Sequence, residues 1–334
     1  MVHPRYDGPV IDVHTHVDGP RVDLVDRIMD VNGIARIVNL WNLAWPPPDF
    51  DRWRAELSLA DKRRMVLYHT PNLSRLAGPD FERFIVDDIQ RAAANGAAGI
   101  KVWKNLGLRI VDEDGRLAPV DDPRLNPLWE TAGATGLPIS IHIADPVAFF
   151  QPLNERNERH AELAAHPDWW FGGPGLPSFP ELLAQCERVV ADHAGTTFIG
   201  VHMGCYAEDL GFVGRMLDAY PNYYVDTSAR ISEFGRHGAS AVRDFFTRYA
   251  SRILFGSDLV RTAAEWLPDD ETYEPTLASF YDRHWRYFET DEKSLPHPFP
   301  VQGDWTVDGI NLSRDVLEQV YYTNARRVIP ALAM

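Results

Sequence analysis

The sequence predicts an α/β fold in which eight parallel strands and the helices between them form a (β/α)8 TIM-like barrel. Eight short apolar runs, mostly rich in Val and Ile, recur between residues 10 and 258. Runs of this kind are expected of parallel strands that are buried on both faces. Most of the intervals between the runs are compatible with helices, and this alternation is typical of a closed barrel. A doubly wound open sheet is the alternative fold.

The predicted strands are residues 10–16, 34–41, 65–70, 99–103, 137–144, 197–204, 223–229 and 253–258. Between them, residues 80–89 place apolar side chains at helical spacing after Asp80, which is a favoured helix cap. A second helix is expected after Asp122, with Pro123 near its first turn and Gly136 at its end.

Two of the intervals are much longer than a minimal connection. Residues 145–180 follow the fifth predicted strand and residues 259–312 follow the eighth, and both intervals are rich in aromatic side chains. The loops that follow the strands of a barrel build its active site. We therefore expect these two long βα loops to cover a small-molecule pocket. The alternatives are packing of the aromatic side chains beneath the loops, and contact with a second copy of the chain in a homo-oligomer.

The composition disfavours several classes of protein. The 334 residues, of which 45% are hydrophobic and 24% charged, suffice for a single barrel domain over residues 1–334. The formal net charge is −15 and the basic residues form no tract, so we expect no nucleic-acid-binding surface. Two cysteines are too few for a disulfide scaffold, and no stretch has the apolar length of a signal peptide or a membrane span. We expect a reduced, cytoplasmic protein that does not bind membranes.

Ionisable residues stand at the ends of the predicted strands. His14 and His16 end the first strand, and residues at positions i and i+2 of a strand point to the same side. His142 and His202 lie near the ends of the fifth and sixth strands, and Asp258 closes the eighth. Each alone is most simply a hydrogen-bonded core residue. Buried together, they are costly unless they are paired or bind a metal, and imidazoles with one carboxylate suit zinc, manganese or iron.

These motifs resemble the amidohydrolase superfamily, specifically its amidohydrolase-2 branch, which is similar to aminocarboxymuconate-semialdehyde decarboxylase. The resemblance runs from Asp12-Val-His-Thr-His to Tyr322-Thr-Asn-Ala-Arg326, with His142, His202 and Gly256-Ser-Asp258 in that order between them. It implies a barrel with one divalent ion, usually zinc, at the carboxyl ends of the strands. By this resemblance, His202 corresponds to the catalytic histidine. The residues that correspond to the metal ligands are His14, His16, His142 and Asp258.

The chemistry of such a site supports the same roles. A divalent ion lowers the pKa of a bound water towards ~7, so that hydroxide is available at neutral pH. Neutral His202 can accept or return a proton, and Asp258 can do so beside the ion. The catalytic residues expected from the sequence are therefore His202 and Asp258.

Lys101 leaves a second arrangement open. It lies in the fourth predicted strand, within Gly-Ile-Lys-Val-Trp. In binuclear amidohydrolases, which this segment resembles, a lysine at this place is carboxylated and bridges two ions, and His142 and His202 would then bind the second ion. The decarboxylase-like branch is usually mononuclear, so we expect Lys101 to be a structural cation or to bind a substrate carboxylate.

The candidate substrate-binding residues near the predicted strand ends are Lys101, Trp103, Arg156 and Arg230, with Lys104 and Arg261 as further cations. Arginine suits carboxylates, so we expect a small, carboxylated substrate, although a surface ion pair is the alternative for each arginine. Hydrolysis of an amide, ester or lactone is the expected reaction, because the superfamily is mostly hydrolytic. Non-oxidative decarboxylation uses the same ligands and is the alternative. The complete ligand set argues against a non-catalytic binding barrel.

Overall fold

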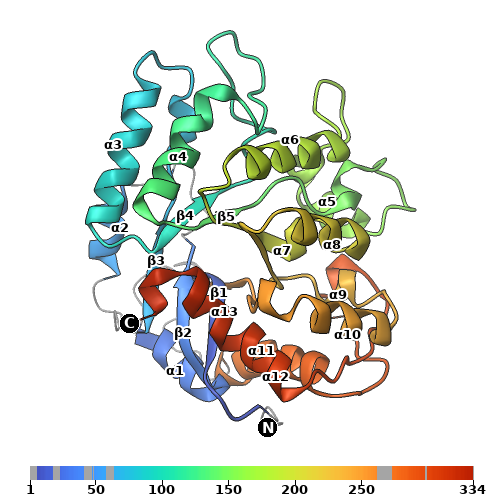
Figure 1. The fold of residues 1–334 in the computed structure, drawn as a ribbon. Helices are drawn as coiled ribbons and strands as arrows, with labels where there is room; N and C mark the ends of the chain where they lie inside the picture. The colour runs from blue at the N-terminus through green and yellow to red at the C-terminus, as the bar shows by residue number, and fades with distance from the viewer. Residues whose placement is uncertain are drawn as a thin grey trace.

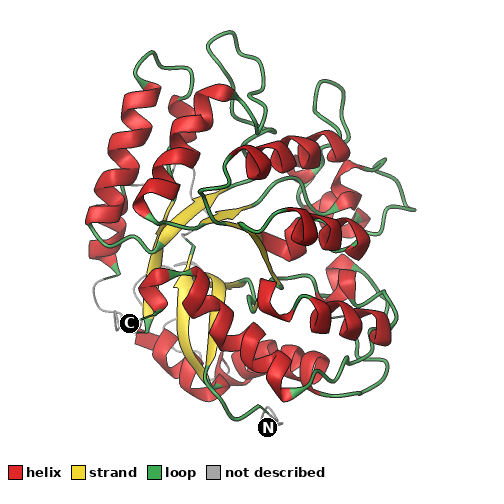
Figure 2. Cartoon of the chain, in the orientation of Figure 1, coloured by secondary structure: helices red, strands yellow, loops and turns green. Residues whose placement is uncertain are grey.

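Parallel strands lie at the centre of the molecule and helices surround them (Figure 2). The computed structural model describes residues 6–17, 23–40, 47, 49–57, 64–261, 273–297 and 299–333. The strands are β1 (Val10–Val17), β2 (Ile34–Asn39), β3 (Met65–His69), β4 (Gly99–Val102), β5 (Ile139–Ile141), β6 (Phe198–Gly200), β7 (Tyr223–Asp226), β8 (Ile253–Leu254) and β9 (Leu259–Arg261). All eight predicted runs contain a strand. The last predicted residue of the second run, Trp41, lies outside the described residues.

The helices follow the strands around the molecule (Figure 1). They are α1 (Asp23–Asn32), α2 (Phe50–Glu56), α3 (Phe81–Ala94), α4 (Asn126–Thr135), α5 (His160–Ala165), α6 (Phe179–Asp192), α7 (Val201–Gly204), α8 (Leu210–Ala219), α9 (Ile231–Phe234), α10 (Ala239–Arg248), α11 (Tyr273–Glu289), α12 (Arg314–Glu318) and α13 (Asn324–Val328). Both helices predicted from the sequence, α3 and α4, are confirmed. The carboxylate of Asp122 caps the turn that leads into α4, and Gly136 ends that helix at a φ of 70°.

The sheet closes on itself through one segment of the chain. Its order is β8-β7-β6-β5-β4-β3-β2-β1-β9, and each neighbouring pair is parallel. The two outermost strands, β8 and β9, belong to the same stretch, residues 253–261. Between them, Val13 N donates to the carbonyl of Phe255 at 2.9 Å, and Asp258 N donates to the carbonyl of His14 at 2.8 Å. Only residues 253–254 of the eighth predicted strand (253–258) form a strand. The stretch pairs with β7 through β8 and with β1 through β9, which lies beyond the predicted strand, and so completes the barrel.

A buried carboxylate stabilises the junction between β1 and the 253–261 segment, which we call the seam. Asp12 accepts hydrogen bonds from the backbone N of His14 at 3.1 Å, from the backbone N of Ser257 at 3.0 Å and from the Tyr281 hydroxyl at 2.7 Å. Burial raises the pKa of Asp12 to about 6, although these hydrogen bonds oppose the shift. Asp12 thus ties β1, the 253–261 segment and α11 together.

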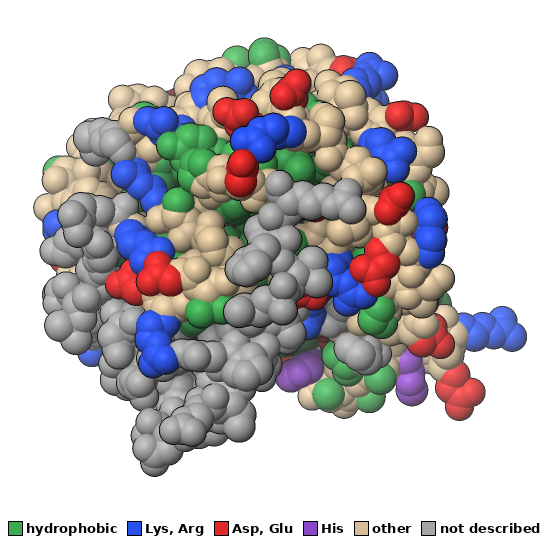
Figure 3. Space-filling view, turned by 90° about the horizontal axis from the view of Figure 1, so that it is seen from below, with side chains coloured by type: hydrophobic (Ala, Val, Ile, Leu, Met, Phe, Trp, Pro, Cys, Tyr) green, Lys and Arg blue, Asp and Glu red, His purple; other side chains and the backbone are tan. Residues whose placement is uncertain are grey.

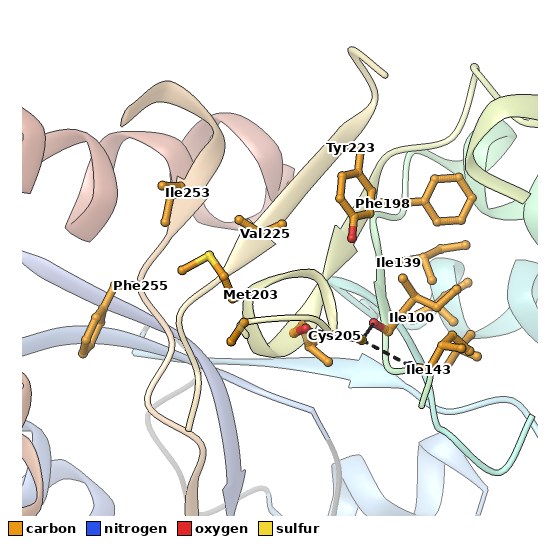
Figure 4. Packing of buried hydrophobic residues seen from close by; sticks show 14 of the residues in the cluster. Ile100, Ile139, Ile143, Phe198, Met203, Cys205, Tyr223, Val225, Ile253 and Phe255 are labelled. Atoms are coloured by element: carbon orange, nitrogen blue, oxygen red, sulfur yellow. Dashed lines mark hydrogen bonds between the residues drawn. The ribbon is translucent and has the colours of Figure 1, made fainter. Parts of the chain in front are cut away.

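Apolar side chains of the strands form two buried clusters. The larger lies between the strands and the surrounding helices, and Figure 4 shows part of it, where Ile100, Ile139, Phe198 and Tyr223 from four successive strands gather near Cys205. The smaller cluster joins strand residues to Ala325 and Val328 of α13 and to residues that follow it. These clusters fix the strands, and hence the side chains at the strand ends.

The two long loops predicted from the sequence are present in the parts that the structure describes. Residues 145–180 follow β5 and contain α5 before α6 begins. Residues 259–312 follow β8 and contain β9 and α11, while residues 262–272 and 298 of this loop lie outside the described residues.

Acidic and basic side chains are interspersed over the face of the molecule shown in Figure 3. No helix within the described residues is long and apolar enough to cross a membrane.

Candidate active site

His14 and His16 of β1 share one carboxylate with the end of the barrel seam. The Nε2 atoms of His14 and His16 lie 3.4 and 3.3 Å from Oδ1 of Asp258. Both imidazoles are buried, as their positions in a fully buried strand require. Gly256 permits this approach, because a Cβ atom at that position would lie 2.8 Å from His14 Cβ. The structure thus brings together three of the four predicted ligands from the two sides of the seam.

The other nitrogen of His14 is held by Asp226, the last residue of β7. His14 Nδ1 lies 2.8 Å from Asp226 Oδ2, so that Nδ1 carries the proton and Nε2 presents a lone pair towards Asp258. Burial, and then the charge of Lys101, lower the pKa of His14 to about 3. The ring is therefore neutral at neutral pH, which is the form that binds a metal. A carboxylate that orients a metal-ligating histidine is a recurrent feature of metal centres.

His142 and His202 stand beside this group. The ring centroids of His142 and His202 are 4.4 Å apart, and those of His14 and His202 are 5.0 Å apart. Burial lowers the pKa of both His142 and His202. His202 Nδ1 lies 3.0 Å from the carbonyl oxygen of Ser228, which leaves Nε2 as its basic nitrogen.

The backbone at these strand ends is unusual. Of the nine described non-glycine residues with positive φ, seven follow β5, β6, β7 or β8. They are Ala144, Asp145, His202, Met203, Cys205, Ala229 and Asp258. This left-handed region is disfavoured for residues with a Cβ, and such conformations gather at functional sites. At His202, with a φ of 55°, the chain leaves β6 and turns into the four-residue turn α7, so this strand is shorter than predicted.

The donor atoms at this end of the barrel fit a divalent ion. Three groups have ligand atoms within 4.8 Å of one another, namely His14-His16-Asp258, His14-His202-Asp226 and His142-Asp145-His202. The buried Nε2 of His14 and both ring nitrogens of His142 have no hydrogen-bond partner among the described residues. Buried nitrogens without partners are costly, and an ion would satisfy them. Histidine nitrogens with carboxylate oxygens suit zinc, manganese or iron.

Asp258 is ionised in this setting. Burial alone would raise the pKa of its carboxyl, but His14, His16 and His202 outweigh burial and hold that pKa well below its usual range. An ionised carboxylate beside histidine nitrogens supplies the negative charge that a divalent ion requires.

Lys101 lies fully buried beside the cluster, and its Nζ has no hydrogen-bond partner among the described residues. Burial lowers its pKa to about 8, although the carboxylates of Asp226 and Asp258 oppose the shift. The Trp103 ring lies 4.9 Å from Lys101 Nζ, and its centroid is 5.2 Å from that of His16. Lys101 and Trp103 are thus both placed next to the predicted ligands.

The predicted substrate arginines are placed differently. Arg230 is buried and donates to the carboxylate of Asp145 through Nε at 3.0 Å and also through Nη2. Arg156 is exposed, and no described hydrogen bond or ion pair joins its side chain to the strand-end residues. Lys104 lies 5.0 Å from the Phe149 ring and 3.5 Å from the carbonyl oxygen of Asp145. The half-buried Arg261 donates to the carbonyl of Val260.

Sequence reasoning missed three residues that contact the predicted ligands. Asp226 orients His14, Ser228 contacts both His14 and His202, and Asp145 lies 3.5 Å from Nε2 of His142. A signal for Asp226 was present, because it is a carboxylate that ends an apolar strand as Asp258 ends another. Asp145 lies beyond β5, and Ser228, although inside the predicted run 223–229, lies beyond the end of β7 at Asp226. The position of each therefore depends on a turn that the sequence pattern does not reveal.

The comparisons with known proteins agree with this fold. A family model described as amidohydrolase matches residues 11–331. Among solved structures, 2,6-dihydroxybenzoate decarboxylase from Rhizobium matches with a TM-score of 0.54 and 17% identity, covering 96% of this chain and 98% of that one. A TIM-barrel protein from Bordetella bronchiseptica matches with a TM-score of 0.54 and 13% identity, covering 98% and 100%.

A third solved structure, 4-oxalomesaconate hydratase from Rhodopseudomonas palustris, matches with a TM-score of 0.52 and 16% identity, covering 97% of this chain and 96% of that one. At these identities the likeness concerns the fold. No curated protein matches the sequence.

Proposed function

Because this chain belongs to the amidohydrolase family, an enzyme family that generally uses divalent metals, we propose that it is a metal-dependent hydrolase. Its substrate is an amide, ester or lactone of a small carboxylated molecule, and the attacking group is an activated water. His14, His16, His142 and Asp258 hold one divalent ion, most simply zinc, and His202 with Asp258 handles the proton. In this proposal the substrate-binding residues include Lys101 and Trp103.

One observation carries the proposal. Neutral, buried imidazole nitrogens without hydrogen-bond partners face an ionised carboxylate at the end of the barrel where active sites form. A structural ion pair would not leave His14 Nε2 and His142 Nδ1 without partners. A divalent ion held there would lower the pKa of a coordinated water and polarise the carbonyl of a substrate.

The protein's own residues supply orientation and proton transfer. Asp226 fixes the tautomer of His14 and aims its Nε2 at the ligand group. The carbonyl oxygen of Ser228 accepts from His202 Nδ1, so that His202 Nε2 can take a proton from the attacking water and return it to the leaving group. The low pKa of His202 keeps that nitrogen unprotonated at neutral pH.

The substrate class follows from Lys101. A buried ammonium without a hydrogen-bond acceptor is costly, and an anionic group of the substrate would relieve that cost. With a pKa of about 8, Lys101 is mostly protonated at neutral pH and can pair with a carboxylate. We therefore assign the substrate carboxylate to Lys101 in preference to the exposed Arg156.

Non-oxidative decarboxylation is the second candidate, and Trp103 favours it. Its ring centroid lies 5.2 Å from that of His16 and 6.5 Å from that of His142, so the ring borders the predicted ligands. A planar aromatic acid would stack on an aromatic ring at this place. The similar structure from Rhizobium is described as a decarboxylase of an aromatic acid.

The metal assignment is tested by metal analysis of the purified protein. We expect about one divalent ion per chain, and the variant in which both His14→Ala and His16→Ala are present should retain none. His69→Gln is the matched control, because His69 is also a buried strand histidine bonded to a carboxylate, Asp88, but stands outside the three ligand groups. Equal metal content in the double variant and the wild type would refute the site. Two ions per chain with a carboxylated Lys101 would establish the binuclear alternative.

The two reactions differ in what they consume and release. The protein should be incubated with panels of carboxylated amides, esters, lactones and aromatic acids in water enriched in oxygen-18. Hydrolysis by attack on the carbonyl puts the label into a product carboxylate, whereas decarboxylation releases carbon dioxide and leaves an unlabelled product with one carboxylate fewer. Carbon dioxide release without label incorporation would replace the first proposal by the second.

A further inference from the structure

Asp145 is a buried carboxylate that begins the loop after β5, three residues beyond His142. Its Oδ2 lies 3.5 Å from His142 Nε2, and its side chain has no solvent exposure. The carboxylate pairs with the guanidinium of Arg230 and lies against the ring of a predicted ligand.

Arg230 holds this carboxylate from the opposite side. It follows β7, and its Nε and Nη2 donate to the two oxygens of Asp145, while Nη1 donates to the carbonyl of Ala229 at 2.8 Å. A guanidinium that forms a two-pronged pair has its plane and its direction fixed. The pair also joins the ends of β5 and β7, whose residues are 85 positions apart in the chain.

The ring of His142 packs against that of His202, but among the described residues Asp145 is the one carboxylate within 4 Å of a ring nitrogen. Both nitrogens of His142 are buried without a hydrogen-bond partner in the described part of the chain, and its nearest described carboxylate oxygen is that of Asp145. An imidazole can bind an ion productively only if the ring is turned correctly, and a carboxylate on its other nitrogen commonly sets that turn. With Asp145 on Nε2, the nitrogen left for an ion is Nδ1.

A second set of buried ion pairs begins at the helix that follows Arg230. The helix α9 that begins after Arg230 carries Glu233, whose carboxylate pairs with the buried Arg159. Arg159 also pairs with Glu162 at 2.9 Å, and Glu162 accepts from Gln302 at 3.0 Å. Arg159 therefore provides a buried arginine of the same region that holds carboxylates but contacts no predicted ligand.

We propose that Asp145 and Arg230 form a positioning pair for His142, so that Arg230 acts on the metal centre through Asp145 and is not a substrate anchor. This inference rests on the proposed metal site. Loss of the charge on Asp145 lets the ring of His142 turn, and loss of the Arg230 fork lets Asp145 move.

The test is the zinc affinity of the purified protein, measured by competition with a chromophoric chelator. We expect about 10–100-fold weaker binding for Asp145→Asn and for Arg230→Met, and an intermediate loss for Arg230→Lys, because lysine keeps the charge but not the fork. The double variant of Asp145→Asn and Arg230→Met should be no weaker than the worse single variant, since both act through one contact. Arg159→Met is the control, and it should lower the unfolding temperature yet keep wild-type affinity.

A second readout needs no ion. In protein labelled with nitrogen-15 at histidine, Asp145→Asn should shift the ring signal of His142, assigned with His142→Gln, and Arg159→Met should leave it in place. Wild-type affinity and an unchanged ring signal in both pair variants would overturn the inference, as would an equal loss of affinity in Arg159→Met. If the wild-type protein binds no divalent ion, both the proposed function and this inference are refuted.

Discussion

His202 carries its imidazole on a residue with left-handed backbone, with a φ of 55° and a ψ of 49°. This conformation lets the chain leave β6 abruptly and brings the backbone N of His202 within 3.0 Å of Asp226 Oδ1. Asparagine tolerates left-handed backbone better than most residues with a Cβ. Replacement by asparagine therefore removes the imidazole with little change to the turn.

We expect His202→Asn to keep its metal and to lose ~10²–10⁴ in turnover, the usual scale for the loss of a general acid–base group. The measurement is turnover on an accepted substrate together with metal content. Loss of the ion in this variant would instead make His202 a ligand, and unchanged turnover would remove it from the mechanism.

At the residue scale the sequence predicts the histidines but not their partners. His14, His16, His142 and Asp258 could be found because each interrupts an apolar strand. Asp145, Ser228 and Arg230 lie in turns, and their contacts depend on how the ends of β5 and β7 meet. The partner of Arg230 could not be foreseen for the same reason, since a strand-end arginine is as consistent with substrate binding as with a buried ion pair.

Asp12 is the residue on which the seam between β1 and the 253–261 segment depends. Asp12→Ala leaves two backbone N–H groups, the Ser257 hydroxyl and the Tyr281 hydroxyl without their acceptor in a buried place. Unsatisfied buried donors are expensive, so we expect a loss of unfolding free energy on the order of 3 kcal/mol. Urea denaturation would measure it.

Tyr281→Phe is the milder comparison, because it removes one donor and leaves the carboxylate its other partners. We expect Tyr281→Phe to lower the unfolding free energy by about 1 kcal/mol. If Asp12→Ala and Tyr281→Phe unfold at the same urea concentration, the seam does not depend on Asp12 in the way proposed.

At the scale of elements, the apolar runs predict where the strands lie. They do not predict the residue at which each strand ends. The run at 197–204 ends as a strand at Gly200, because positive φ at His202 and Met203 turns the chain. The run at 253–258 breaks after Leu254, and strand pairing resumes only at Leu259. The first departure occurs at non-glycine residues with left-handed backbone, which sequence patterns do not reveal, and the second run ends at another such residue, Asp258.

For the whole molecule, an ion held between β1, β5 and the seam should stabilise the folded chain. An ion that binds only the folded state at a hundred times its dissociation constant contributes about 2.7 kcal/mol. Unfolding 334 residues carries an entropy of roughly 0.7 kcal/mol/K, so the unfolding temperature should rise by about 4 °C.

Calorimetry of chelator-treated protein before and after zinc addition would measure this rise. The variant with His14→Ala and His16→Ala should show none. A rise of equal size in that variant would mean that zinc stabilises the protein from another place.

The seam joins residues that the ribosome makes at very different times. Ser257 N bonds to Asp12 across 245 positions of the chain, so β1 emerges long before the segment that closes it. Asp258 leaves the exit tunnel 242 positions after His16. Pairings this distant in sequence are slow to form, because the long loop between them must close first. At the proposed metal site, ion capture therefore waits for the 253–261 segment, and a nascent chain stalled before residue 253 holds the histidines of β1 without Asp258.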